Sequence, residues 1–263
     1  MHRPRPRVAI PVAAATVLAV AATVFVLTHR DHATPLKPNA AVDKFRAIVG
    51  SATASPAAGP RSAPQPGVYS YDTTGFEKTD VLSGARHDYP AISTVTYTPK
   101  GCGAEDRWQP LVGRFSANAT CRTPAGLELR STVQHREFFG RLQAQTFTCP
   151  AGFVELPIPA HVGQRSQTTC AGTSGSLALT ARVLGSSIMH VAGESVEVTH
   201  LVLSGRLTGS TTGTISRDLW LAATTGLLVR ATATADTRSD TLAGPAKYTE
   251  RYTVTLKSLA PQR

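Results

Sequence analysis

The sequence predicts a mainly β protein: a curved antiparallel sheet, half-barrel or sandwich-like, preceded by one N-terminal transmembrane helix. Apolar and polar residues alternate with period two along many short segments, and 21 glycines and 18 prolines supply turns between them. An uncharged run near the N-terminus predicts the helix. Hydrophobic residues make up 41% of the 263 residues, which excludes a fully disordered chain.

The N-terminus is predicted to be a cytoplasmic basic tail, residues 1–7, followed by a transmembrane signal-anchor, residues 8–27. The second segment carries no charge and, as a helix, spans about 30 Å, the thickness of a bilayer's hydrocarbon core. Three arginines precede it, so the positive-inside rule places the rest of the chain outside the cytoplasm. The alternative is a secreted protein cleaved near Ala21, because Ala19–Ala21 has the small-x-small form. The apolar run continues to Leu27, which favours the uncleaved anchor.

Residues 28–66 are rich in proline, alanine and serine, and are predicted to form a flexible tether. A short helix over Ala40–Val49, capped by Asn39, is one interpretation of part of it. That helix would place three apolar side chains on one face: Val42, Phe45 and Val49. The other interpretation is a turn beside the membrane that packs on nothing.

Residues 67–263 are predicted to form one extracytoplasmic β domain. Alternation is clearest at 251–257 and 227–235. Strands with one threonine-rich face are typical of antiparallel sheets wetted on one side. Noisier alternation predicts six further strands, at 67–72, 92–98, 127–134, 177–184, 196–203 and 215–221.

The apolar face of the 227–235 strand is the candidate ligand-binding surface. Its alanines keep the face apolar but shallow, so the structure opposite either approaches closely or leaves room for an apolar ligand. The alternative is that a helix or second sheet of the same chain fills the space. The candidate residues are Leu227, Val229, Ala231 and Ala233, continued by Ala235.

The four cysteines, Cys102, Cys121, Cys149 and Cys170, are predicted to form two disulfides, because their number is even and they lie outside the membrane. Sequential pairing, the first with the second and the third with the fourth, is the simplest of three connectivities. No C-x-x-C occurs, which argues against redox motifs and zinc ribbons.

The net charge of +10 suggests a nucleic-acid partner at first sight, but its distribution does not. Residues 1–46 hold seven Lys/Arg and two Asp, net +5, so half of the excess is near the membrane segment. Elsewhere the arginines are spaced singly among glutamates, which predicts a solvated surface of mixed sign and no nucleic-acid binding. These residues are Arg107, Arg114, Arg122, Arg130, Arg136, Arg141, Glu128 and Glu137.

No catalytic signature, metal-ligand spacing or cofactor motif is found, so we expect no enzyme activity, cofactor or metal site. His87 with Asp88, and His135 with Glu137, are pairs in which a carboxylate orients an imidazole. Surface or strand-edge histidines are the favoured interpretation. Core packing or turns account for the conspicuous aromatic residues: Trp108, Trp220 and Phe138-Phe139-Gly140.

Two resemblances add to this interpretation. Segments 67–71, 84–90, 101–103 and 135–140 resemble uncharacterised membrane-anchored proteins of high-GC Gram-positive bacteria, which implies location without function. Asp218–Leu221 and Gly226–Arg230 look like the late hairpin of LolA-like lipoprotein and lipid carriers. Those families have a curved antiparallel sheet around an apolar cavity. This chain lacks the lipidated cysteine of their lipoprotein members, since its first cysteine is Cys102.

The sequence therefore favours a non-catalytic binding or sensor module in the plasma membrane, anchored by its N-terminal helix. Its partner would be an apolar or lipid ligand. The alternative is a structural module that binds a cell-envelope protein, and a hydrolase is the least favoured class. An internal apolar cavity is expected for the first function and unnecessary for the second.

Overall fold

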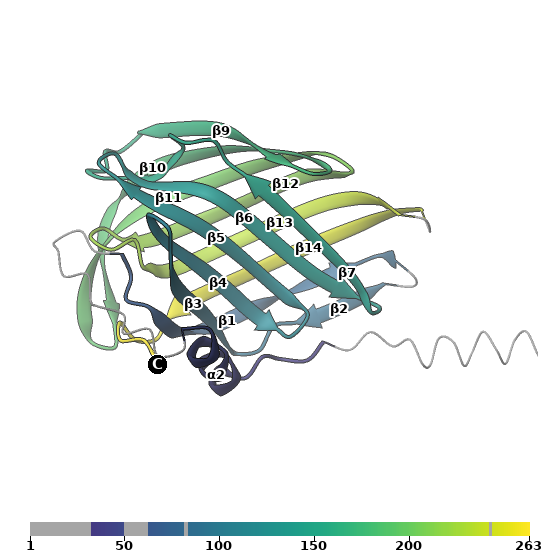
Figure 1. The fold of residues 1–263 in the computed structure, drawn as a ribbon, viewed down its shortest axis with the longest axis horizontal. Helices are drawn as coiled ribbons and strands as arrows, with labels where there is room; N and C mark the ends of the chain where they lie inside the picture. The colour runs from purple at the N-terminus through teal and green to yellow at the C-terminus, as the bar shows by residue number, and fades with distance from the viewer. Residues whose placement is uncertain (1–32, 50–62, 82–83, 242–243) are drawn as a thin grey trace, which may run out of the picture.

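The computed structural model describes residues 33–49, 63–81, 84–241 and 244–263. These residues form one α-helix, α2 (Pro38–Val49), and a large antiparallel sheet (Figure 1). The strands are β1 (Gly67–Thr79), β2 (Ala85–Asp88), β3 (Ile92–Lys100), β4 (Gly103–Leu111), β5 (Arg114–Thr123), β6 (Gly126–Phe138), β7 (Arg141–Thr148), β8 (Val154–Pro157), β9 (Arg165–Gly172), β10 (Gly175–Val191), β11 (Glu194–Gly209), β12 (Thr211–Ala222), β13 (Leu228–Thr241) and β14 (Gly244–Leu256).

The sheet closes on itself into a ring. Its order runs β14-β13-β12-β11-β10-β9-β7-β6-β5-β4-β3-β1, and β14 also pairs with β1. That last pairing covers nine positions, from Tyr71↔Leu256 to Thr79↔Tyr248. β2 pairs with Phe76–Thr79 of β1, on the side of β1 where β3 pairs with Gly67–Asp72, and β8 pairs with β6. The predicted antiparallel sheet is confirmed, but it is neither a half-barrel nor a sandwich, because the first and last strands meet.

The two ends of the ring carry different turns. One end holds a cavity and the other a buried network of charged side chains, and we call them the cavity end and the network end. The cavity end is formed by the β3–β4, β5–β6 and β12–β13 turns. The network end is formed by the β4–β5, β6–β7 and β13–β14 turns. β4 runs from the first end to the second, and its nine residues span about 30 Å at about 3.3 Å per residue.

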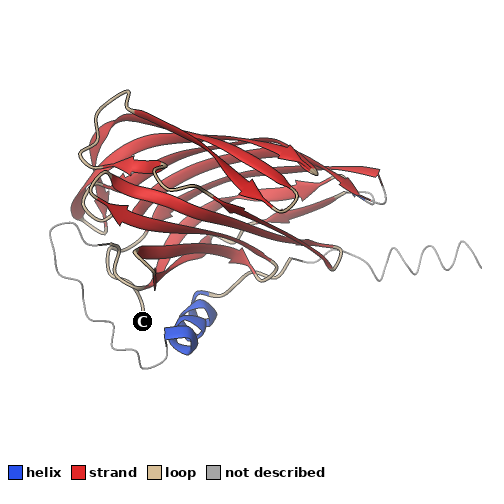
Figure 2. Ribbon diagram, turned by 45° about the horizontal axis from the view of Figure 1, so that its top comes forward, coloured by secondary structure: helices blue, strands red, loops and turns tan. Residues whose placement is uncertain are grey.

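Of the two interpretations of this part of residues 28–66, a short helix or a turn that packs on nothing, the helix is present, and it lies outside the ring (Figure 2). It begins at Pro38, whose missing N–H and fixed φ suit the first helical position, so Asn39 is not its cap. The first helical hydrogen bond runs from the Ala41 N–H to the Lys37 carbonyl, 3.3 Å. Its buried side chains pack with Val68 of β1, so residues 33–49 fold onto the sheet instead of forming a tether.

The chain just before α2 is fixed at the network end. Pro35 bridges to Leu111, and the Val112 N–H donates to the Thr34 carbonyl at 2.9 Å. Within the described residues, no helix has the length and apolar character needed to cross a bilayer. The span predicted at Val8–Leu27 lies outside the described residues, as does the signal-peptide alternative.

Candidate functional site

The predicted apolar face of β13 points into the ring. Leu227, Val229, Ala231 and Ala233 are all buried, as is Ala235. Aromatic side chains of the same chain occupy much of the interior opposite them. The Trp108 ring lies 4.2 Å from the Tyr252 ring and 5.2 Å from the Tyr89 ring, between centroids. The chain therefore fills most of the space that an apolar ligand would need.

A cavity of about 90 Å³ remains inside the ring at the cavity end. Of the four predicted ligand-face residues, Ala231 lines it and the other three do not. Its wall combines apolar and aromatic side chains with charged and amide groups. The lining includes Trp108, Tyr252, Leu219, Val254, Asn118, Asp106, Glu155, Arg122 and Arg217.

The charged groups of this cavity come from four strands. Asp106 of β4 accepts a hydrogen bond from the Asn118 amide at 2.9 Å. Arg122 of β5, Glu155 of β8 and Arg217 of β12 complete the set. The ring encloses both carboxyl groups, yet each keeps some accessible surface because it faces the cavity. Among the described residues, no ion pair joins Arg217 to either carboxylate.

The enclosure changes the acidity of both carboxyl groups. Loss of water around Asp106 raises its pKa to about 6, although Asn118 and Arg217 oppose the shift. Loss of water also raises the pKa of Glu155 to about 7, with the negative charge of Asp106 adding to the rise and Arg217 opposing it. Both carboxyl groups therefore titrate near neutral pH, where a charged ligand would change the fraction of each that is protonated.

A buried ionic network occupies the other end of the ring. His87 lies 3.0 Å, Nδ1 to Oε1, from Glu77, which is fully buried. Tyr248 donates to the second oxygen of Glu77 at 2.9 Å. Arg114 lies 3.4 Å from that oxygen and donates to Glu250 at 2.6 Å. A second cavity, of about 160 Å³, adjoins this network, and in its wall Glu77 pairs with both His87 and Arg114.

The burial of three charged residues corrects the predicted solvated surface of mixed sign. Arg114, Arg136 and Glu128 are buried, so they do not belong to such a surface. Both arginines are held by internal partners, since the Arg136 guanidinium donates to Gln134 and lies 3.8 Å from the Tyr248 ring centroid. Burial of an arginine is tolerated where such partners replace water.

The two histidine–carboxylate pairs that the sequence offers as the less favoured interpretation are not among the contacts of the described residues, and the favoured surface or strand-edge position is wrong for His87, which is buried. His87 is buried and contacts Glu77, while its neighbour Asp88 pairs with Arg86 at 2.7 Å. His135 Nδ1 lies 3.3 Å from the Gly113 carbonyl, and its ring stacks on Phe115. Neither histidine lines the 90 Å³ cavity.

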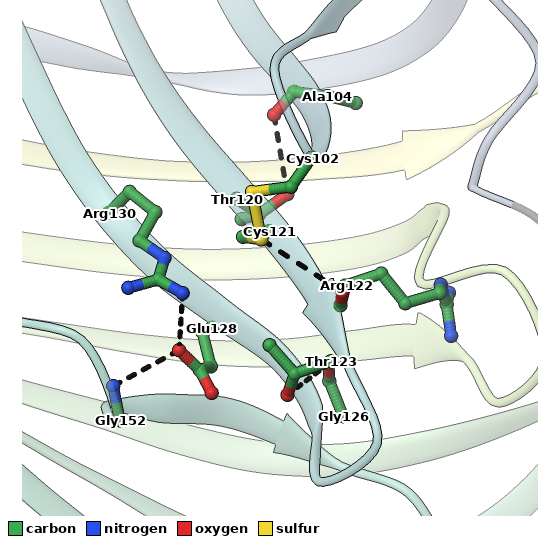
Figure 3. The surroundings of a disulfide bond; sticks show 10 residues. All are labelled: Cys102, Ala104, Thr120, Cys121, Arg122, Thr123, Gly126, Glu128, Arg130 and Gly152. Carbon is green, nitrogen blue, oxygen red and sulfur yellow. Dashed lines mark hydrogen bonds and ion pairs between the residues drawn. A yellow bond between two sulfur atoms is a disulfide. The ribbon is translucent and has the colours of Figure 1, made fainter.

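Both predicted disulfides are present with the sequential pairing, Cys102–Cys121 and Cys149–Cys170. The first joins the β3–β4 turn to β5 at the cavity end (Figure 3). Nearby, Glu128 accepts from Arg130 at 2.8 Å and from the Gly152 N–H at 3.0 Å. These contacts fix the strands that carry Asn118 and Leu127 into the cavity wall.

The cavity's charged residues were missed at the sequence level. Asp106, Glu155 and Arg217 stand in segments without a motif, and no spacing links them. Asp106 alternates with Ala104 and Trp108 along β4, so its side chain faces inward with theirs. This alternation is the feature of the sequence that could have indicated its inward position.

No protein-family model and no curated protein matches this chain. Among solved structures, it is similar to the hypothetical lipoprotein YmcC from Escherichia coli (K12), with 15% sequence identity and a TM-score of 0.36. That similarity covers 84% of this chain and 96% of the other. The resemblance to proteins of high-GC Gram-positive bacteria stays a prediction.

Proposed function

We propose that this protein is a membrane-anchored, non-catalytic binding module outside the cytoplasm, which takes its ligand into the 90 Å³ cavity. The observation that carries this proposal is the cavity's wall, where apolar side chains surround the carboxyl groups of Asp106 and Glu155 and the guanidinium of Arg217. Clefts with a mainly apolar lining and a few convergent polar groups are the usual form of ligand sites. The two histidines most suited to acid–base chemistry contact other groups elsewhere in the ring.

The cavity's size limits what it holds. About 90 Å³ corresponds to roughly three water molecules at about 30 Å³ each, against about 300 Å³ or more for a drug-sized ligand. A whole lipid does not fit in this form of the ring. A small molecule, or one end of a larger one, does.

The anchor gives the module an orientation. Residues 28–32 lie between the predicted span and Ala33, and five extended residues reach at most about 18 Å. Because residues 34 and 35 are fixed to the β4–β5 turn, the network end would then face the membrane. The exposed Val112 of that turn suits such a position. The cavity would open on the far side, so its ligand would arrive from outside instead of from the bilayer.

Native mass spectrometry of the full chain, extracted in detergent from its own membrane, tests this proposal. We expect a bound small molecule on the wild type and none on Ala231→Leu, whose larger side chain would enter the cavity. Detection of the unliganded mass alone for the wild type would contradict the proposal.

A second candidate function is binding of a cell-envelope protein, favoured by the outer edge of β7. Beyond its pairing with β6, this strand pairs with β9 only at Phe147 and Thr148, which leaves residues 141–146 unpaired on that side. Leu142 in this segment is also exposed. A partner strand could add there, since unpaired edges are templates for pairing. Co-purification of a protein that Leu142→Lys abolishes would support this alternative.

A further inference from the structure

The most informative part of the cavity is the place where Asp106 and Glu155 face it together. Asp106 accepts a hydrogen bond from the Asn118 side-chain amide. None of the described residues donates a hydrogen bond to the Glu155 carboxylate. Arg217 is the cation that acts on both groups. The two carboxylates are therefore opposed by one guanidinium.

From this arrangement we infer that the ligand is a small organic cation, an amine or guanidine on a short apolar arm, held between Asp106 and Glu155. The inference rests on the proposed function and names its ligand class. A carboxylate enclosed by protein requires hydrogen-bond donors or an opposite charge in place of water. An N–H cation supplies both to the two carboxylates at once.

The electrostatics agree with this geometry. Despite Arg217, the pKa of Asp106 stays raised to about 6 and that of Glu155 to about 7. The fixed positive charge of the wall thus does not offset the loss of water. A bound cation would lower both pKa values and release protons near neutral pH.

The other cation of the lining, Arg122, is held at the rim. Its guanidinium donates to the carbonyl oxygens of Thr224 and Thr225, at 3.4 and 3.1 Å, in the β12–β13 turn. These two carbonyl oxygens hold the Arg122 guanidinium at the β12–β13 turn.

The remaining wall suits the apolar arm. Trp108 and Tyr252 present aromatic rings to the cavity, and Leu219 and Val254 present aliphatic side chains. Aromatic faces attract ammonium and guanidinium groups as well as alkyl chains. The volume admits an arm of only a few carbon atoms.

Three compounds with the same size of arm separate charge from shape: n-butylamine, n-butanol and butyrate. Calorimetric titration of the full chain in detergent, near neutral pH, measures each affinity. We expect the amine to bind at least about tenfold more tightly than the alcohol, and butyrate to bind most weakly. Heats of amine binding should also vary with the ionisation enthalpy of the buffer, which reports proton release.

Two variants and a matched control locate the effect. Glu155→Gln should reduce amine affinity at least about tenfold and leave alcohol affinity unchanged, and Asp106→Asn should do the same. Glu105→Gln, one residue away on β4, is the control, because Glu105 pairs with Lys100 outside the cavity. Thermal melts confirm folding. Should Asp106→Asn fail to fold, Glu155→Gln carries the test, since no described residue hydrogen-bonds to the Glu155 side chain.

Equal affinity for butylamine and butanol, tightest binding of butyrate, or no binding of any compound would each overturn the cation inference. An unchanged amine affinity in Glu155→Gln would do so as well. The binding function is judged separately, because native mass spectrometry of the protein from its own membrane detects a ligand of any charge.

Discussion

Cys149 and Cys170 are joined at the register position directly beyond the last residue pair of β7 and β9, Thr148↔Ala171. These two strands pair at only two positions, whereas β4 and β5 pair at seven. The ring is thus closed by a covalent bond where its hydrogen-bonded ladder is shortest. The disulfide takes the place of the strand pairing that is missing there.

Removal of this disulfide should open the ring locally. In Cys149→Ser with Cys170→Ser we expect a loss of about 3 kcal/mol of unfolding free energy and faster hydrogen exchange in β7 and β9. The matched control is Cys102→Ser with Cys121→Ser, which opens a loop of similar length, 19 against 21 residues. This control should lower the free energy of unfolding by a similar amount and leave hydrogen exchange in β7 and β9 unchanged. Identical exchange rates for β7 and β9 in the two variants would contradict a weak junction between these strands.

We expect the loss of a buried charge from the ionic network to lower the free energy of unfolding much more than the loss of an exposed charge. Glu250→Gln removes the charge that faces Arg114, both of them buried, and we expect a loss of about 3–5 kcal/mol. Asp236→Asn disrupts the half-exposed pair with Arg251 and should cost about 1 kcal/mol or less. Urea denaturation of both variants makes the comparison. Losses of similar size would contradict the buried role of Glu250.

The cavity carboxyl groups predict a specific pH dependence. Asp106 and Glu155 have higher pKa values folded than their ordinary 3.8 and 4.5, so the folded state binds their protons more tightly. Their stabilising contribution is present below the ordinary values and is lost as pH rises through about 6 to 7. The protein should be more stable at about pH 5 than at about pH 7.5, and Asp106→Asn with Glu155→Gln should flatten this difference.

Glu250 acts in another pH window. Burial disfavours its charge, but Arg114 and Arg136 outweigh that effect and lower its pKa below 4.5. The contribution of ionised Glu250 to the stability of the fold is complete above pH 4.5, and it is lost as the pH falls through the lowered pKa of this group. Denaturant titrations at about pH 5 and about pH 7.5 therefore report the cavity groups. Equal stability at the two pH values would contradict their raised pKa values.

The alanine face of β13 can be tested residue by residue. Ala231 lines the cavity and Ala233 does not, although both are buried on the same face of the strand. Ala231→Leu should be tolerated because its side chain enters open space. Ala233→Leu should cost about 1–3 kcal/mol through overpacking. If thermal melts show the same loss for both, Ala231 is close-packed and the cavity is smaller than described.

Much of the architecture could be predicted from the sequence because one face of each predicted strand is apolar. All eight strands predicted from alternation fall on observed strands, and the β13 alanines face inward as expected. Six strands were missed: β2, β4, β5, β7, β8 and β9. β4 turns Asp106 inward and has Glu105 and Arg107 on its other face, so its alternation carries little hydropathy contrast. β7 is exposed on both faces over most of its length.

Closure of the ring and the charged groups inside it could not be predicted. The β1–β14 pairing joins residues about 180 positions apart, and no local pattern encodes it. Arg114 and Arg136 looked like surface residues because their partners, Glu250 and Tyr248, lie far away in sequence. Long-range partners decide whether a single charge is buried, and the sequence does not show them.

Binding of a ligand inside the ring can be observed in a crystal structure of the wild-type protein, purified from its own membrane without added compounds. We expect electron density for a small molecule inside the ring, bounded by Trp108 and Tyr252, with a donor group within hydrogen-bond distance of Asp106 or Glu155. A cavity that contains only water, together with a ligand bound outside the ring, would contradict it.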